Sequence, residues 1–153
     1  MKLFGVLIGI IILSGLFLFM HYLKKAKAKI QKNISQRYLG QNIVLKDNSA
    51  NFFGKKSLKS RQFRGNGILI LTEEEIYFSM FIPRKEVIVS LDSIQDIETP
   101  TRFLGKTKFK PLLKINFEAC QEVQDSAAWL VKDVKKWKKE IQERTKNLKK
   151  RFS

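Results

Sequence analysis

The chain has few of the residues on which catalytic and metal sites most often depend. Its 153 residues include one cysteine, Cys120, and one histidine, His21. A single cysteine excludes an intrachain disulfide framework and agrees with a reducing compartment. Nucleophilic catalysis by Cys120 would need a histidine to activate the thiol, and His21 lies at the edge of an apolar N-terminal run.

Catalytic motifs are also lacking. No G-x-S-x-G, P-loop or metal-ligand spacing occurs in the sequence. Three adjacent acids, Glu73, Glu74 and Glu75, fall in a short polar turn, where they would splay apart rather than converge on a substrate. We therefore predict no catalytic residue, no metal site and no cofactor, and we do not expect an enzyme.

Acidic residues are absent from the first 40 positions, and residues 3–23 carry no formal charge at all. A helix of these 21 residues would be roughly 31 Å long, about the hydrocarbon thickness of a bilayer. A cleaved signal peptide is the alternative, but the run is longer than such a core and no small-x-small cleavage site follows it. A buried core helix is not favoured, since the run has no polar stripe. We predict a transmembrane anchor over residues 1–23.

The lysines around this span predict its orientation. Lys2 precedes it, whereas five lysines follow it within nine residues, and Lys and Arg near a span stay on the cytoplasmic side. We expect a single-pass membrane protein with the N-terminus outside and about 130 residues in the cytoplasm. The five juxtamembrane lysines are Lys24, Lys25, Lys27, Lys29 and Lys32.

Two features near the anchor have more than one interpretation. Gly5 and Gly9 have the G-x-x-x-G spacing that lets membrane helices dimerise, although glycine is common in such helices and the homodimer is the less favoured interpretation. Residues 24–40 form a basic segment with an apolar face. This segment could extend the membrane helix, lie on the surface as an amphipathic helix, or be a solvated charged linker, and Gly40 is a plausible helix stop.

The formal net charge of +16 is distributed unevenly. Residues 1–40 hold seven basic residues and no acid, residues 41–134 have a net charge of +2, and residues 135–153 have a net charge of +7. Half of the excess would lie against the bilayer, where each Lys or Arg can gain about 1 kcal/mol from anionic lipid. Nucleic acid binding is not favoured, because no zinc-ligand spacing, helix-turn-helix signature or aromatic RNA-binding motif accompanies the charge.

From about residue 41 the hydrophobic period changes to two, which predicts strands. The clearest is a hairpin of residues 67–72 and 75–81. The first strand is the least defined, with residues 42–45 and residues 51–54 as its candidate segments, and Thr99-Pro100-Thr101 breaks the pattern. The other expected strands are residues 86–91, a bend and strand over 92–98, residues 111–117 and residues 126–131.

The chain then changes to a helical period. Val134, Trp137, Ile141 and Leu148 follow helical spacing, and Asp133 is a suitable N-cap. We interpret Trp137 and Ile141 as residues that pack this helix against the sheet.

This layout resembles the pleckstrin-homology-like (PH-like) domains, in particular their GRAM-like and bacterial PH-like branch. The resemblance covers residues 41–148, with a basic tail at residues 149–153. It implies a mainly β, α+β fold, in which a bent antiparallel sandwich or barrel of seven strands is capped by one C-terminal helix. The resemblance is carried by Gly67 to Thr72 followed by Ile76-Tyr77-Phe78, by Val89 to Ile97, and by Trp129 to Val131 followed by Trp137 and Ile141.

The resemblance implies binding rather than chemistry. In lipid-binding members the loop between the first two strands supplies basic residues, and Lys59 and Arg61 fit a basic-x-basic pattern. On an extended strand these two would point to one face, about 6.6 Å apart. Arg102, Lys106, Lys108 and Lys110 form a second basic run, and a solvated surface is the alternative for both sets. The candidate residues for anionic lipid are Lys55, Lys56, Lys59, Arg61 and Arg64.

Two functions therefore remain open from the sequence. In the first, an anchored tether or scaffold recognises anionic lipid head groups at the cytoplasmic membrane face. In the second, the same anchored domain binds a protein partner and has no lipid ligand. The identities of the ligand and of the partner do not follow from the residues.

Overall fold

The computed structural model describes residues 2–59, 62–119 and 123–151, without the side chains of residues 2–7 and 151. The chain divides into two compact units. The first unit is Met1–Leu39 and the second is Gly40–Ser153. Arg61 and Cys120 lie outside the described residues.

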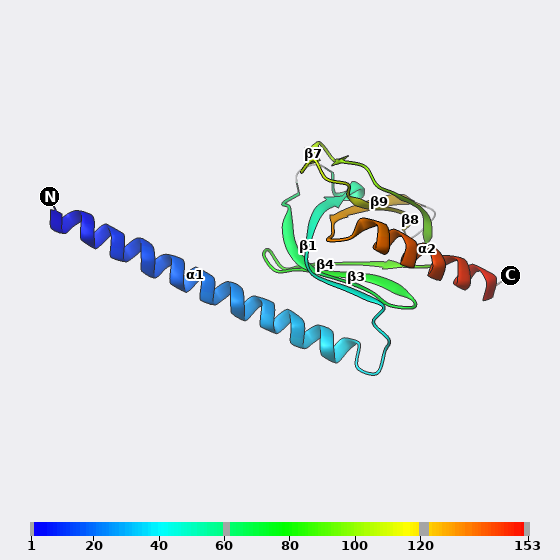
Figure 1. Cartoon of the computed structure of the whole chain (residues 1–153), viewed down its shortest axis with the longest axis horizontal. Coiled ribbons are helices and arrows are strands. Elements are labelled where there is room, and N and C mark those ends of the chain that lie inside the picture. The colour runs from blue at the N-terminus through cyan, green and yellow to red at the C-terminus, as the bar shows by residue number, and fades with distance from the viewer. Residues whose placement is uncertain (1, 60–61, 120–122, 152–153) are drawn as a thin grey trace. The chain divides into compact units, whose positions relative to one another are not determined.

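The first unit is one helix, α1, which covers Lys2–Arg37 (Figure 1). Its 36 residues correspond to about 54 Å at 1.5 Å per residue. The apolar run and the basic segment that follows it therefore form one continuous helix, and Gly40, with a φ of 79°, lies just past its end. Within the part of the chain that the structure describes, α1 is the one helix that is long and apolar enough to cross a membrane.

The second unit contains a mainly antiparallel sheet. Among the described residues, seven strands form this sheet in the order β4-β3-β2-β1-β9-β8-β5. The prediction of seven antiparallel strands followed by a C-terminal helix is confirmed. The strands are β1 (Leu45–Lys55), β2 (Gly65–Leu71), β3 (Glu75–Met80), β4 (Lys85–Ser90), β5 (Ile94–Glu98), β8 (Leu113–Glu118) and β9 (Gln124–Leu130).

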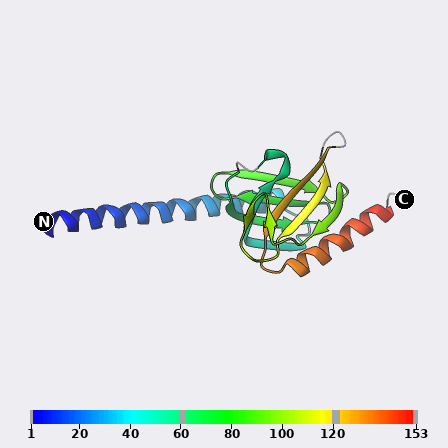
Figure 2. The same cartoon turned by 90° about the horizontal axis from the view of Figure 1, so that it is seen from above.

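The sheet is strongly bent, as Figure 2 shows, and it encloses the main apolar core. Phe78 on β3 and Trp129 on β9 are separated by two strands in the sheet order, yet their ring centroids are 6.1 Å apart. Phe52 on β1 lies between them, 5.4 Å from Phe78 and 5.7 Å from Trp129. Val89 of β4 and Ile97 of β5, the two end strands, belong to the same core cluster, so the bent sheet shares one core as in a sandwich.

The first strand differs from its prediction. The sequence indicated short strands at residues 42–45 and 51–54, whereas β1 is one strand of 11 residues that begins at Leu45. Its register shifts between Asp47 and Ala50 and again between Phe52 and Gly54. These bulges interrupt the alternation of buried and exposed residues, so a period of two could not identify the whole strand.

Three short elements lie in loops that the sequence did not resolve. A 3-10 turn, η1 (Lys56–Leu58), follows β1. The strands β6 (Arg102–Phe103) and β7 (Lys106–Thr107) pair as a separate hairpin. Phe103 of this hairpin packs with Phe53, Leu112 and Ala128 in a small second cluster. The hairpin therefore covers the outer face of β1.

The C-terminal helix α2 (Val134–Arg151) packs against β5 and β8. Asp133 caps it, with Oδ1 accepting a hydrogen bond of 3.0 Å from the main-chain N–H of Lys136. Trp137 and Ile141 are buried in the main core cluster. The amphipathic spacing of these side chains is what holds the helix to the sheet.

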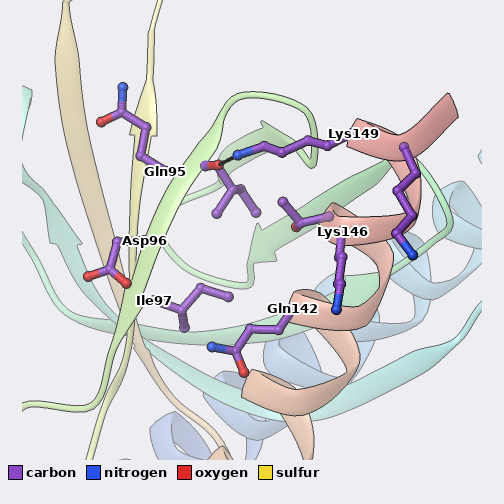
Figure 3. Close-up of a pocket in the computed structure, with 9 residues that line it drawn as sticks. Gln95, Asp96, Ile97, Gln142, Lys146 and Lys149 are labelled. Carbon is purple, nitrogen blue, oxygen red and sulfur yellow. Dashed lines mark hydrogen bonds between the residues drawn. The ribbon is translucent and has the colours of Figure 1, made fainter. Parts of the chain in front are cut away.

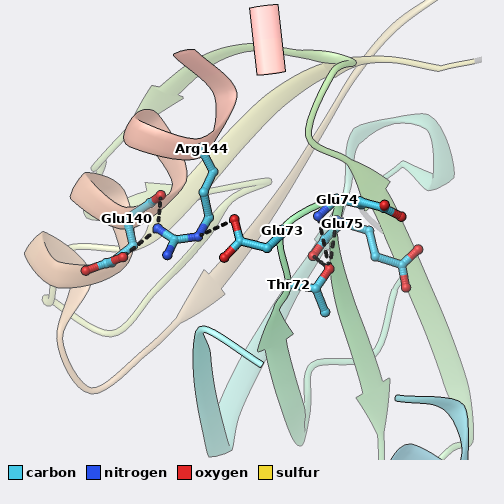
Figure 4. Close-up of polar contacts among 6 residues, drawn as sticks. All are labelled: Thr72, Glu73, Glu74, Glu75, Glu140 and Arg144. Atoms are coloured by element: carbon cyan, nitrogen blue, oxygen red, sulfur yellow. Dashed lines mark hydrogen bonds and ion pairs between the residues drawn. The ribbon is translucent and has the colours of Figure 1, made fainter. Parts of the chain in front are cut away.

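An ion-pair network joins α2 to the turn between β2 and β3 (Figure 4). Arg144 bonds Glu140 through Nη1 and Oε2 at 2.6 Å, and its Nε lies 3.4 Å from Oε2 of Glu73. Thr72 shapes the turn, because its hydroxyl oxygen accepts hydrogen bonds from the N–H groups of Glu74 and Glu75. The three adjacent glutamates are thus residues of a tight turn, and Glu73 has a structural partner.

Candidate functional site

Four basic residues meet at the end of the sheet where β1 leads into β2. Lys55 ends β1, Arg64 immediately precedes β2, Lys85 begins β4 and Lys106 begins β7. The strand pairing explains their proximity, since Phe52 pairs with Gly65 and Met80 pairs with Lys85. We call Lys55, Arg64, Lys85 and Lys106 the cationic cluster.

Gln62 connects three members of the cationic cluster. Its side-chain Oε1 accepts a hydrogen bond from the main-chain N–H of Lys55 at 3.0 Å and lies 3.4 Å from Nζ of Lys85. Its Nε2 donates to the carbonyl oxygens of Lys55 and Lys59. Its main-chain carbonyl oxygen accepts from Nζ of Lys106 at 2.6 Å. The side-chain amide and the main-chain carbonyl of this residue therefore hold the loop between β1 and β2 against two ammonium groups.

Two members of the cationic cluster lie over the faces of aromatic rings. The guanidinium carbon of Arg64 is 4.0 Å from the ring centroid of Phe53, and Nη2 of Arg64 lies 3.4 Å from Oδ1 of Asn51. Nζ of Lys85 is 5.2 Å from the ring centroid of Phe52. These cation–π contacts position the charged groups without neutralising them.

Asp125 is the acid in contact with this group of cations. Its Oδ2 is 3.1 Å from Nζ of Lys55, and its Oδ1 accepts hydrogen bonds from the N–H groups of Ser57 and Ser126. Burial acts to raise the pKa of Asp125, but the hydrogen bonds from Ser57, Lys55 and Ser126 outweigh it and lower the pKa below its usual value. Asp125 is therefore a charged residue that holds η1 onto β9.

The charges of the cationic cluster disfavour one another. Burial lowers the pKa of Lys85, and the nearby charges of Lys55 and Lys106 lower it further. Burial also lowers the pKa of Lys106, with a contribution from Arg64. A bound anion would relieve this repulsion and would be gripped by several donors at once. The arrangement is thus suited to binding an anion.

The structure brings together only part of the predicted site. Lys55 and Arg64 belong to the cationic cluster, whereas Lys56 is exposed on η1 and lines a separate cavity beside Asp125. Lys59 is exposed and has a φ of 58°, so it does not lie on an extended strand and the predicted strand geometry with Arg61 is wrong at Lys59. A register of alternating side chains does not apply after a 3-10 turn.

Sequence reasoning missed Lys85 and Gln62. Lys85 lies outside both basic runs of the sequence, and no local signal distinguishes it from other surface lysines. Lys106 was noted in the second basic run, whose other members, Arg102, Lys108 and Lys110, are exposed. The pairing of β3 with β4, and the contact of the β6–β7 hairpin with β1, decide which of these lysines converge.

The five juxtamembrane lysines lie on α1, outside the second unit. Lys24, Lys25, Lys27, Lys29 and Lys32 are all exposed on α1. Within the described residues, no group of three or more His, Cys, Asp or Glu side chains could hold a metal ion.

Comparison with known proteins defines the fold but no family. No protein-family profile matches the chain, and no curated protein matches its sequence. Among solved structures, the C-terminal domain of an unknown protein from Leishmania infantum superposes with a TM-score of 0.55 at 8% identity, covering 77% of this chain and 96% of that one. The Vps36 N-terminal PH domain superposes with a TM-score of 0.50 at 18% identity, covering 71% of this chain and 82% of that domain.

A PH-containing fragment is similar at a slightly lower score. The DH/PH fragment of PDZRHOGEF, solved in complex with human RhoA, has a TM-score of 0.49 at 9% identity over 71% of this chain and 30% of that one. The superposition on the Vps36 N-terminal PH domain, together with the strand order and the C-terminal helix, shows that the second unit has a PH-like fold. At these identities the similarity concerns the fold alone.

Proposed function

We propose that this chain is a membrane-anchored PH-like module that recognises anionic lipid head groups at the cytoplasmic face of the membrane. The observation that carries the proposal is the cationic cluster. The ammonium groups of Lys85 and Lys106 both contact Gln62, and the nearby charges of Lys55 and Arg64 act on them. Asp125 is paired with Lys55. A phosphate group offers the multiple acceptor oxygens that such an arrangement can bind.

Exposed apolar residues beside these cations support a membrane ligand. Phe63, which lies between Gln62 and Arg64, is 79% exposed, and Leu58 on η1 is 49% exposed. A bilayer surface accepts apolar and basic side chains together, because the rings can enter the interface while the ammonium groups remain among the head groups. A soluble anion would use the charges alone.

The anchor supplies the location in this proposal. The apolar part of α1 spans the bilayer, and the juxtamembrane lysines remain on the cytoplasmic side with the PH-like unit. The sequence motifs further suggest the GRAM-like branch of the PH-like proteins. A tether that holds two membranes, or a scaffold on one membrane, is the role that fits an anchor joined to a lipid-facing domain.

Vesicle flotation tests the ligand. The full chain is held in phosphatidylcholine nanodiscs and mixed with vesicles of phosphatidylcholine, with or without phosphatidylglycerol. We expect binding only to the anionic vesicles. Lys85→Gln combined with Lys106→Gln should weaken it roughly thirtyfold, since two lost cations at about 1 kcal/mol each amount to about 2 kcal/mol.

The matched control is Lys135→Gln combined with Lys136→Gln, which removes the same charge from two exposed positions at the start of α2. Equal weakening by both pairs would show that only net charge matters and would overturn the site. Because Lys106 also bonds main-chain oxygens, a single Lys85→Gln variant, checked for unchanged thermal unfolding, separates a lost ligand contact from a disturbed loop.

The lone cysteine tests the topology. A membrane-impermeant thiol reagent should label Cys120 only after the cell membrane is permeabilised, because the residue lies in the second unit. Lys2→Cys in a Cys120→Ser background should be labelled in intact cells. Labelling of Cys120 in intact cells would contradict the orientation, and an intact mass lacking the first 23 residues would indicate a cleaved signal peptide.

A further inference from the structure

The strand β5, the last in the sheet order, has a bulge that turns two isoleucines to the same side. Ile94 and Ile97 are three positions apart, so regular alternation would place their side chains on opposite faces of the sheet. The register against β8 shifts between Ile94 and Asp96, and both isoleucines are buried in the main core cluster. Figure 3 shows Ile97 directed towards α2. The side of β5 that faces this helix is therefore apolar.

A groove lies between β5 and the last turns of α2 (Figure 3). Its volume is about 370 Å³, at the small end of the range for ligand sites. Ile94 and Ile97 form its apolar floor, and the opposite wall includes the side chains of Gln142 and Lys146. A lysine side chain contributes an apolar methylene stem as well as its charge. A groove of this size and lining admits one apolar chain.

The groove has a positive charge that its own acids do not balance. Three lysines of α2 line it: Lys146, Lys149 and Lys150. Among the described residues that line the groove, Asp96 is the one acid, and Figure 3 shows its carboxylate directed away from α2. Glu98, the other acid of β5, is paired with Lys114 at 2.8 Å. The lysines of the groove are therefore in excess over its acids, and an anion would balance them.

One polar group of the groove is buried without a partner. The hydroxyl oxygen of Thr145 has no hydrogen-bond partner among the described residues. Nearby, Nζ of Lys149 lies 3.4 Å from the carbonyl oxygen of Ile94, so this side chain crosses one end of the groove. A buried hydroxyl without a partner is costly, and an acceptor in the groove would satisfy it. A carboxylate or phosphate oxygen is such an acceptor, and the lysines would attract its charge.

We propose that this groove binds an anion with a single apolar chain, either a fatty acid or a monoacyl phospholipid. The chain lies along Ile94 and Ile97, where its apolar surface leaves water. The anionic head group accepts a hydrogen bond from Thr145 and pairs with Lys146. A neutral chain would leave the lysines without a counter-charge, and an anion without a chain would leave the apolar floor unused. The inference goes beyond the proposed function, because the groove shares no residue with the cationic cluster.

A photoreactive probe tests the ligand class. The full chain, held in phosphatidylcholine nanodiscs, is irradiated with decanoate that carries a diazirine on its chain, and mass spectrometry locates the attached label. We expect label in residues 94–97 and 142–150. Unlabelled decanoate should compete, whereas decanol should compete about tenfold less well, because its head group has no charge to attract the lysines. Acetate, which has the charge but no chain, should not compete.

A second probe identifies the source of the ligand. Lysophosphatidic acid with a diazirine on its acyl chain is incorporated into the nanodisc bilayer and irradiated in the same way. Label in the groove from this probe would support the inference with a membrane lipid as the ligand. Label from decanoate alone would support it with a soluble fatty acid as the ligand.

Two variants separate the charge of the groove from its hydroxyl. Lys146→Gln combined with Lys150→Gln removes two charges and should reduce labelling by decanoate about tenfold. Thr145→Val keeps the shape of the side chain and should reduce labelling severalfold. Without the probe, this variant should be at least as thermally stable as the native chain, because it loses an unpartnered hydroxyl. The matched control, Lys135→Gln combined with Lys136→Gln, changes two exposed positions outside the groove and should be labelled like the native chain.

Three results would overturn the inference. The first is that neither probe labels residues 94–97 or 142–150. The second is that decanol competes as well as decanoate. The third is that the control pair reduces labelling as much as Lys146→Gln plus Lys150→Gln. Lys85→Gln combined with Lys106→Gln should leave labelling of the groove unchanged while it weakens vesicle binding, so a failure of this inference is distinguishable from a failure of the proposed function.

Discussion

The two ends of strand β2 differ in how their charges are balanced. Beyond Leu71, at the turn into β3, Arg144 lies between Glu140 and Glu73, and each charge has an opposite partner. Before Gly65, at the other end, Asp125 is paired with Lys55, whereas Arg64, Lys85 and Lys106 are contacted by Gln62, by main-chain carbonyl oxygens and by aromatic rings. The charges at the first end are paired, whereas at the second end neutral groups make most of the contacts.

This difference gives a criterion for interpreting basic residues in a chain with a net charge of +16. Lysines are abundant everywhere in it, so their number identifies no site. What distinguishes the cationic cluster is that mutual repulsion and burial lower the pKa of Lys85 and Lys106 while the fold still holds them together. Charges kept close at a cost to stability are candidates for function.

The largest expected effect on stability comes from disrupting the packing of α2 against the sheet, at the end of β2 where the charges are paired. Trp137→Ala removes a buried ring from the main core and should lower the free energy of unfolding by about 3–5 kcal/mol. Urea unfolding of the full chain in detergent, followed by tryptophan fluorescence, measures this loss of stability. Lys135→Ala, at an exposed position on the same helix, should change stability by no more than about 0.5 kcal/mol. Equal effects would mean that α2 does not depend on its apolar face.

A smaller loss is expected when the acid at the cationic cluster is neutralised. Asp125→Asn removes the charge that faces Lys55 and should cost about 2 kcal/mol at neutral pH. Because the folded pKa of Asp125 lies below its ordinary value of 3.8, its contribution is complete above that value and is lost as pH falls through the folded pKa.

Acid unfolding curves check this sign. The difference in stability between the native chain and the Asp125→Asn variant should shrink as the pH is lowered below 3.8. A difference that stays constant with pH would show that the carboxylate charge has no part in holding η1 to β9.

Breaking the paired charges at the turn between β2 and β3 should have a smaller effect on stability. Arg144→Met breaks the ion pairs with Glu140 and Glu73, both of which can be hydrated once freed, and it should lower the free energy of unfolding by about 1 kcal/mol. High salt should reduce this difference, since the Glu73 side chain is 56% exposed. A loss above about 3 kcal/mol would indicate that the network is a main support of α2.

The smallest effect should have the opposite sign. Lys85→Met removes a charge that its neighbours repel, so the variant should be as stable as the native chain or more stable by about 0.5 kcal/mol or less. In the native chain the folded pKa of Lys85 is below 10.5, so its charge destabilises the fold at neutral pH and the penalty fades as pH rises through the folded pKa.

Unfolding measured from neutral to alkaline pH sharpens this comparison. The advantage of Lys85→Met should disappear as the pH approaches 10.5. A destabilised Lys85→Met variant at neutral pH would instead assign Lys85 a structural role like that of Arg144, and the distinction between the two ends would not hold.

Much of the fold was predictable because its signals are local. The hairpin of β2 and β3 follows an uninterrupted apolar pattern around the turn at Thr72, and α2 follows the spacing of Trp137 and Ile141 behind the Asp133 cap. Predictions were weakest at β1, because its two bulges break the alternation on which strand recognition depends. The β6–β7 hairpin, with two residues a strand, is too short to show any period.

The candidate site was predictable only in part. Lys55 and Arg64 flank one loop, and a loop can be recognised from the residues around it. Lys85 and Lys106 come from segments 21 or more positions beyond Arg64, and only the tertiary fold brings them to the same end of the sheet. No local pattern in the sequence indicates the groove between β5 and α2, because it depends on where α2 packs.

By itself the sequence determined the uncharged N-terminal run, the lysines that follow it, the succession of most strands along the chain and the amphipathic last helix. Each of these features depends on residues that are neighbours along the chain. The tertiary structure alone decided which few of the many lysines converge, which charges are paired and which edge of the sheet stays open. Those outcomes depend on distances between residues far apart in sequence, and local composition and periodicity carry no information about such distances.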